Sequence, residues 1–126
     1  MNITAVRGAI DIPESAEEQN QMVKSVGNLV NSLCNLNRIS AKRIICVQLT
    51  QTSDLVRKNA AAALREAIPE FNHVPLFCSQ EPVIEDSLPR TVRILITWRT
   101  WRGSKMTKPL YLGAAQKLRP KTIDKK

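Results

Sequence analysis

The sequence predicts an α+β domain in which a mixed β-sheet carries helices packed on one face. Three observations predict this fold. Short apolar segments with the two-residue period of a strand alternate with two longer segments of helical period. The resulting order, β-α-β-α-β-β-β, is typical of layered α/β and α+β folds. At 126 residues, 43% of them apolar, the chain is long enough for one core and short for two.

The first strand is predicted over residues 2–7, where side chains alternate between two faces. Arg7 shares its face with Ile3 and Ala5. Its guanidinium is therefore expected either to point toward the covered side of the sheet or to reach water along an edge. The pattern favours neither outcome over the other. Gly8 and Pro13 are expected to end the strand.

Two helices are predicted from apolar stripes at helical spacing. Ser15 and Glu18 have the spacing of a capping box, and the stripe that follows ends near residue 37. The second helix is predicted over 55–67, where alanine is frequent, with its cap at residues 53–54.

The other strands follow from alternation and apolar runs, bounded by proline and polar residues. They are predicted over 43–49, 74–77, 91–98 and 110–112, and a short helix or turn is predicted over 113–118. One domain is expected over 1–120, and the basic tail 121–126 is expected to be disordered.

Composition narrows the class of partner. The net charge of +8 favours anions: a nucleic acid, an acidic membrane surface or a small anionic substrate. Three cysteines and one histidine lack the spacing of a standard structural zinc site, so no such metal site is expected. Unpaired cysteines, with no signal peptide and no apolar run of about 18 residues, favour the cytoplasm.

A thiol, a carboxylate and a guanidinium lie close to segments that otherwise resemble core: Cys78, Glu81 and Arg93. Because charged groups are rarely buried without a partner, a site for a small anion is the first hypothesis. Each residue alone has a simpler interpretation, as a small core residue, a loop carboxylate and an arginine on a solvated strand face. His73 is the only histidine that could activate Cys78 as a nucleophile.

Four short segments carry a family resemblance. They are Val6-Arg7-Gly8-Ala9, Val74-Pro75-x-x-Cys78-x-Gln80-Glu81, Val92-Arg93, and Tyr111-Leu112 with Leu118-Arg119-Pro120. In this order and spacing they resemble the small trimeric chorismate mutases of the α/β-barrel class, over nearly the whole chain. The resemblance implies trimerisation into a pseudo-α/β-barrel with sites at subunit interfaces. It also implies the isomerisation of chorismate to prephenate, a [3,3] rearrangement of aromatic amino acid biosynthesis, without a cofactor.

The resemblance also implies roles for individual residues. Arg93 would donate to the ether oxygen of the breaking bond, and Arg7 with Tyr111 would hold a substrate carboxylate. Glu81 would accept a hydrogen bond from the ring hydroxyl, with Cys78 beside the ring. The further substrate contacts that it implies are Leu76, Phe77, Leu118, Arg119, Arg65 and Ala61. A dianionic substrate in an intramolecular reaction suits forked arginines rather than a nucleophile or a metal.

Two positions of the predicted second helix depart from the family. Asn59 and Ala62 stand where the family usually has an aromatic residue and a lysine. Loss of the lysine predicts weaker substrate binding, seen as a raised KM more than a lowered kcat. Arg65 and Lys58 are the cations that could compensate for it.

Two alternatives remain open from the sequence. A catalytically weakened paralogue could act as an anion-binding or nucleic-acid-binding module, with Trp98 and Trp101 stacking bases between basic residues. A trimeric imine deaminase of related fold is the second alternative. Against it, the chain lacks the arginine-cysteine segment of that family.

Overall fold

The computed structural model describes residues 1–101 and 107–118. Its strands are β1 (Asn2–Asp11), β2 (Ile44–Gln51), β3 (Leu76–Gln80), β4 (Thr91–Thr100) and β5 (Leu110–Leu112). Its helices are α1 (Glu18–Asn37) and α2 (Ala60–Ala67), with short 3-10 helices η1 (Ala41–Arg43), η2 (Pro69–His73) and η4 (Gly113–Leu118). The predicted element order is confirmed. The predictions for Arg119 and for the tail 121–126 lie outside the described residues.

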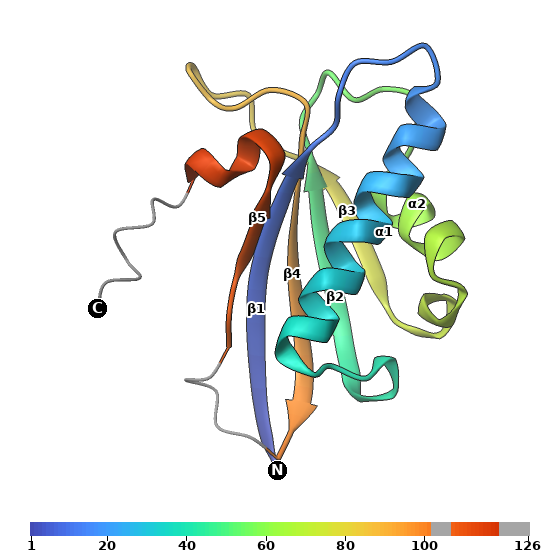
Figure 1. Cartoon of the computed structure of the whole chain (residues 1–126), viewed down its shortest axis with the longest axis vertical. Helices are drawn as coiled ribbons and strands as arrows, with labels where there is room; N and C mark the ends of the chain where they lie inside the picture. Colours follow the sequence, from blue (N-terminus) through green and yellow to red (C-terminus); the bar gives the residue numbers. More distant parts are fainter. Residues whose placement is uncertain (102–106, 119–126) are drawn as a thin grey trace.

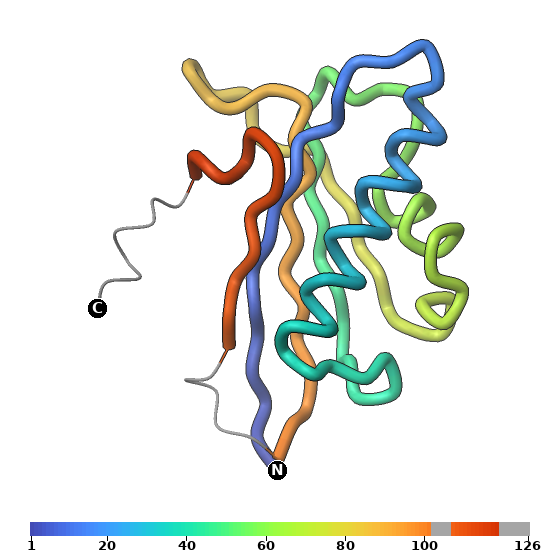
Figure 2. The backbone as a smooth tube through the Cα atoms, in the orientation of Figure 1, coloured from blue at the N-terminus to red at the C-terminus, as the bar shows by residue number. Residues whose placement is uncertain are grey.

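The strands form one mixed five-stranded sheet in the order β3-β2-β4-β1-β5. β4 is antiparallel to both β1 and β2, whereas β3 is parallel to β2 and β5 is parallel to β1. Figure 1 shows α1 and α2 on the same side of this sheet. The mixed sheet with helices on one face is therefore confirmed. Figure 2 shows that the loops before α1, α2 and β4 all lie at the same end of the sheet.

Side-chain alternation divides the sheet into two faces. The helix face packs against α1 and α2, and each of its rows crosses several strands. One row is Val6, Ile96, Val47 and Leu76, and the next is Gly8, Ile94, Leu49 and Cys78. All of these except Gly8 belong to the hydrophobic core or pack against it. The hydrophobic core therefore lies between the helix face of the sheet and the two helices.

The other surface of the sheet, which we call the open face, carries the residues between those rows. Its rows include Arg7, Leu95, Gln48 and Phe77, and then Ala9, Arg93, Thr50 and Ser79. Of the two outcomes that the sequence left open for Arg7, the structure excludes the covered side of the sheet. Val6 and Gly8 face the helices, so the strand alternation directs Arg7 to the open face, where it is exposed.

Gly8 is required by close packing between α1 and β1. A Cβ atom at this position would lie 2.7 Å from Leu33 Cδ1 and 2.9 Å from the carbonyl oxygen of Leu110. Gly8 does not end the strand as expected, because β1 stays paired with β4 as far as Asp11. Its missing side chain instead lets helix and strand approach each other.

The capping box predicted at Ser15 and Glu18 is wrong. The Oγ atom of Ser15 accepts a hydrogen bond from the backbone N–H of Glu17, and no side chain caps α1. The Glu18 carboxylate instead binds Arg90 and the backbone N–H of Arg57. A contact that is distant in sequence has replaced the local one.

The start of α2 also differs from the prediction. The helix begins at Ala60 rather than at residue 55, and its cap is Asn59 rather than residues 53–54. The Asn59 Oδ1 atom accepts hydrogen bonds from the N–H groups of Ala61 and Ala62, at 2.8 and 3.1 Å. One side chain thus satisfies two of the free donors at the helix start.

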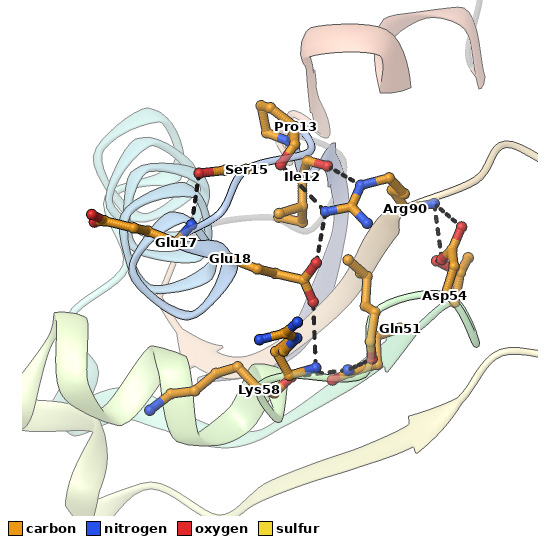
Figure 3. A network of polar contacts seen from close by, with 12 residues as sticks. Ile12, Pro13, Ser15, Glu17, Glu18, Gln51, Asp54, Lys58 and Arg90 are labelled. Atoms are coloured by element: carbon orange, nitrogen blue, oxygen red, sulfur yellow. Dashed lines mark hydrogen bonds and ion pairs between the residues drawn. The ribbon is translucent and has the colours of Figure 1, made fainter.

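Arg90 ties three loops together where the sheet ends (Figure 3). Its guanidinium donates to the carbonyl oxygens of Ile12 and Pro13 and forms an ion pair with Glu18 at 2.9 Å. Its backbone N–H donates to the carboxylate of Asp54. Arg90 has a φ of 49°, an uncommon conformation for a residue with a side chain. These contacts fix the point at which β4 begins.

Candidate active site

A cavity of about 430 Å³ lies on the open face, where β1, β2, β4, β5 and η4 meet. Its lining residues are Arg7, Gly8, Gln48, Thr50, Arg93, Ile94, Leu95, Tyr111 and Leu118. Four of these were predicted as site residues: Arg7, Arg93, Tyr111 and Leu118. The register of the sheet explains their convergence. Tyr111 pairs with Ala9, and Ala9 pairs with Arg93, so the three residues form one row.

Glu81 joins this group through Arg93. The Nε atom of Arg93 donates to Oε2 of Glu81 at 2.7 Å, and the hydroxyl of Thr50 donates to Oε1 at 2.9 Å. The Glu81 side chain is only 14% exposed, so the carboxylate sits in a largely enclosed position with both oxygens satisfied. Its backbone N–H donates to the carbonyl oxygen of Gln51, which extends the pairing of β2 with β3. Glu81 is therefore held from both its main chain and its side chain.

The pairing leaves part of Arg93 available to a ligand. Only Nε is used by Glu81, and within the described residues no hydrogen bond joins either terminal nitrogen to another group. The Arg93 side chain is 38% exposed, so these two donors can be reached from the cavity. A guanidinium with two unused parallel N–H groups can bind two oxygen atoms at once.

The cavity carries a net positive charge. Arg7 and Arg93 both line it, and Glu81 is the carboxylate that pairs with one of them. Within the described residues, Arg7 takes part in none of the three ion pairs. A concave site with an unneutralised guanidinium attracts anions. The geometry thus fits a small molecule with more than one negative group.

The remaining predicted site residues lie elsewhere in the chain. Cys78 and Leu76 are on the helix face of β3, the opposite surface from the 430 Å³ cavity. Ala61 is buried in α2, Arg65 is exposed on the same helix, and Phe77 on β3 is 68% exposed. Within one chain, Cys78 and Glu81 therefore do not meet at one cavity: Cys78 lies on the helix face, whereas Glu81 binds Arg93 of the open face.

A second cavity, of about 220 Å³, lies beside Cys78 and the start of α2. Its lining residues are Gln51, Thr52, Ser53, Leu55, Val56, Asn59, Cys78, Ser79 and Gln80. It shares no lining residue with the 430 Å³ cavity. The predicted site residues therefore form two separate groups, one at the 430 Å³ cavity and one along α2 and the edge strand β3.

The structure gives no sign that Cys78 or Cys34 is activated as a nucleophile. The Cys78 thiol donates to Oε1 of Gln51 at 3.3 Å, and no hydrogen bond in the described part of the chain joins it to His73. Burial raises the pKa of the Cys34 thiol from 9.0 to about 11, so this thiol stays protonated at neutral pH. Residues 1–101 and 107–118 contain no cluster of His, Cys, Asp or Glu that could hold a metal ion.

Sequence reasoning missed Thr50, Gln48 and Gln51. The strand predicted over 43–49 ends two residues early, since β2 continues to Gln51. Gln48 lies within the predicted strand, and extending the alternation by one residue would have placed Thr50 on the same face, beside Arg93. No local signal identified Gln51, because its partners come from a loop, a helix and another strand.

Comparison with known proteins decides the family. The family model described as chorismate mutase type I matches residues 3–122. The chain belongs to the type I chorismate mutase family. A curated relative, chorismate mutase AroH of Thermus thermophilus, is 30% identical over 119 residues, which is 94% of each protein. The solved structure of a chorismate mutase from Clostridium thermocellum superposes with a TM-score of 0.81 at 25% identity, over 89% of this chain and 96% of that one.

Membership of this family confirms the predicted activity. The protein is a chorismate mutase, an isomerase of aromatic amino acid biosynthesis whose substrate is chorismate and whose product is prephenate. The two alternatives are not favoured. Trp98, which a nucleic-acid-binding module would need on the surface, is only 3% exposed and belongs to the core.

Within the described residues, no helix has both the length and the apolar character that a membrane-spanning helix requires.

Proposed function

We propose that Arg93 stabilises the transition state of the rearrangement and that Arg7 and Tyr111 bind the substrate beside it. The observation that carries this assignment is the ion pair between Arg93 Nε and Glu81 Oε2 at 2.7 Å. It orients the guanidinium while leaving its two terminal nitrogens for the substrate. In the rearrangement a carbon–oxygen bond breaks as a carbon–carbon bond forms, and negative charge develops on the ether oxygen. A preoriented cation at that oxygen lowers the barrier.

The remaining groups on the open face bind and orient chorismate. Arg7 has no ion-pair partner among the described residues, and it would pair with a substrate carboxylate with help from the hydroxyl of Tyr111. The Glu81 carboxylate would accept a hydrogen bond from the ring hydroxyl. Leu118 closes one side of the cavity. Because the reaction is intramolecular, holding the reactive conformer is itself a large part of catalysis.

The second group of residues supports a site shared between subunits. Ala61, Arg65, Phe77 and Cys78 lie on α2 and on β3, an edge strand of the sheet. Exposed apolar side chains on the open face, such as Phe77 and Ile3, would be covered if another copy packed there. A homotrimer in which this edge of one subunit closes the cavity of the next accounts for both groups. Three free cysteines suit the cytoplasm as its location.

The test of the Arg93 role follows the loss of chorismate absorbance with purified wild-type protein, Arg93→Ala and Arg93→Lys. We expect kcat to fall by about 10²-fold or more in both variants, because a lysine cannot bind Glu81 and the substrate with one planar fork. Arg43→Lys, at an exposed arginine of η1, is the matched control and should keep wild-type rates. Full activity in Arg93→Lys would contradict the proposed role.

A subunit-mixing experiment tests the shared site. Arg93→Ala impairs the open-face group and Arg65→Ala impairs the α2 group. If each site takes one group from each of two subunits, refolding the two variants together creates some sites with both groups intact. We expect the mixture to be clearly more active than the sum of the separate variants. A mixture no more active than that sum would contradict a site shared between subunits.

A further inference from the structure

Gln51, the last residue of β2, makes four hydrogen bonds through its carboxamide. Its Nε2 atom donates to the carbonyl oxygens of Leu55 and Lys58 at 2.9 and 3.0 Å. Its Oε1 atom accepts from the backbone N–H of Ala60 at 2.7 Å and from the thiol of Cys78 at 3.3 Å. Figure 3 shows the Gln51 side chain directed at the loop that carries Lys58. Both donors and both lone pairs of the amide are therefore used.

These four bonds join the elements that hold the second group of site residues. Ala60 is the first residue of α2, and Leu55 and Lys58 belong to the loop that leads into it. Cys78 lies on the neighbouring strand β3. One side chain therefore sets the position of the α2 start relative to β3, the two elements on which Ala61, Arg65, Phe77 and Cys78 lie.

The α2 helix needs such an anchor because it has only eight residues. A helix this short is not stable by itself, and its position depends on contacts with the rest of the fold. The Asn59 side chain caps the first turn, but both of its bonds stay within the helix and its cap. Gln51 supplies the side-chain bonds that connect this cap region to the sheet.

We propose that Gln51 is a positioning residue of the active site, which fixes α2 and Cys78 for substrate binding at the shared site. This inference rests on the proposed function, since it assumes that the α2 group closes the cavity of a neighbouring subunit. The role needs a carboxamide. A carboxylate at the same place would face the carbonyl oxygens of Leu55 and Lys58 with no proton to donate, whereas a protonated carboxyl group would again donate to one of them.

The test uses the pH dependence of KM in Gln51→Glu, measured by chorismate turnover between pH 5 and pH 8. At pH 8 we expect KM to rise about tenfold, the size expected for unmade buried hydrogen bonds, with kcat changed less. Relative to the wild type, KM should return toward normal at pH 5 as the introduced carboxyl group gains a proton. The titratable group in direct contact with it is the Cys78 thiol, and the Lys58 ammonium is already paired with Glu66.

Two further variants complete the experiment. Gln51→Met keeps the length of the side chain but has no protonation state, so its KM should be raised equally at every pH. Gln19→Glu, at an exposed glutamine of α1, should match the wild type throughout. Thermal melting at each pH, with kinetics measured well below the transition, separates misplacement of α2 from unfolding.

The outcomes distinguish the inference from the proposed function beneath it. A wild-type KM in both Gln51 variants, or a raised KM in Gln51→Glu that does not respond to pH, would overturn the positioning role. Failure of subunit mixing, with a pH-dependent KM still observed in Gln51→Glu, would overturn only the shared site. In that case Gln51 would act on a site within its own chain.

Discussion

The carboxylate of Glu81 binds the Nε atom of Arg93 with one oxygen and the hydroxyl of Thr50 with the other. Glu81 comes from the segment after β3, Arg93 from β4 and Thr50 from β2, so the contact joins three parts of the sheet. An arginine held in this way offers a fixed pair of donors rather than a mobile charge.

This relationship predicts the effect of Glu81→Gln. The amide still accepts one hydrogen bond but has lost the charge that orients and balances Arg93, so kcat should fall by about 10-fold to 10³-fold. Steady-state turnover of chorismate measures the change. Thr50→Val removes only the neutral partner of Glu81, and its loss of kcat should be smaller. An equal loss in the two variants would mean that the charge on Glu81 is unimportant.

The ion pair between Lys58 and Glu66 predicts that substrate affinity can be raised. Lys58 is one of the two cations expected to replace the family lysine at position 62, yet Glu66 neutralises it. Glu66→Gln releases this ammonium, and Ala62→Lys restores a cation directly. We expect each change to lower KM by about twofold to fivefold, since exposed charges interact weakly, and to leave kcat unaltered.

The salt dependence of KM checks that explanation. A lower KM caused by an added cation should return to the wild-type value in about 0.5 M salt, where exposed charges are screened. Glu70→Gln removes an exposed carboxylate of η2 for which no ion pair occurs in the described structure, and it is the matched control. A KM equally low at high salt would point to a change in packing instead.

The contacts of Arg90 predict a large stability effect. The Arg90 and Glu18 side chains are 18% and 12% exposed, so removing one partner leaves a poorly solvated charge. Arg90→Ala should lower the free energy of unfolding by about 3 kcal/mol, measured by urea denaturation. Arg38→Ala, at an exposed arginine that shares the positive φ, controls for the backbone conformation and should cost less. Equal losses would place the effect in the backbone rather than in the ion pair.

The Cys34 thiol predicts a loss of stability in alkali. Burial raises its pKa in the folded state to about 11, above the ordinary value of 9.0 that the unfolded chain should have. The stability that the burial of the neutral thiol allows is therefore fully present below pH 9. It is lost between pH 9 and pH 11, because the thiol ionises at lower pH in the unfolded state than in the folded state. Urea denaturation at pH 8 and pH 10 should show a larger drop for the wild type than for Cys34→Ala. Parallel drops would contradict the raised pKa.

The fold could be predicted from the sequence because its signals are local. Alternation in 91–98 places Val92, Ile94 and Ile96 on one face, and all three are buried in β4 as that pattern requires. The helix starts were wrong for the opposite reason. Glu18 binds Arg90, 72 positions away, and the start of α2 depends on Gln51. The first contact lies outside any local window; the second spans nine positions, but the residue types alone do not distinguish Asn59 from Ser53 and Asp54 as the cap of α2.

Some residues of the candidate site could be predicted from the sequence and others could not. Arg7, Arg93 and Tyr111 could be named from family resemblance, and one sheet surface brings them together. Cys78 could be named but not placed, because a single register step decides which face of β3 it occupies. Thr50 and Gln51 were missed because the end of a strand is the part of the pattern that alternation defines least well.

Gly8 lies at the boundary between the core and the cavity. Its main chain lines the cavity, while the space that a Cβ would fill is taken by Leu33 of α1. Only the thickness of one strand therefore separates an apolar helix side chain from the cavity. A substitution at Leu33 can therefore change the shape of the cavity although Leu33 is not one of its lining residues. A bulkier side chain there would press on β1, the strand from which Arg7 lines the cavity.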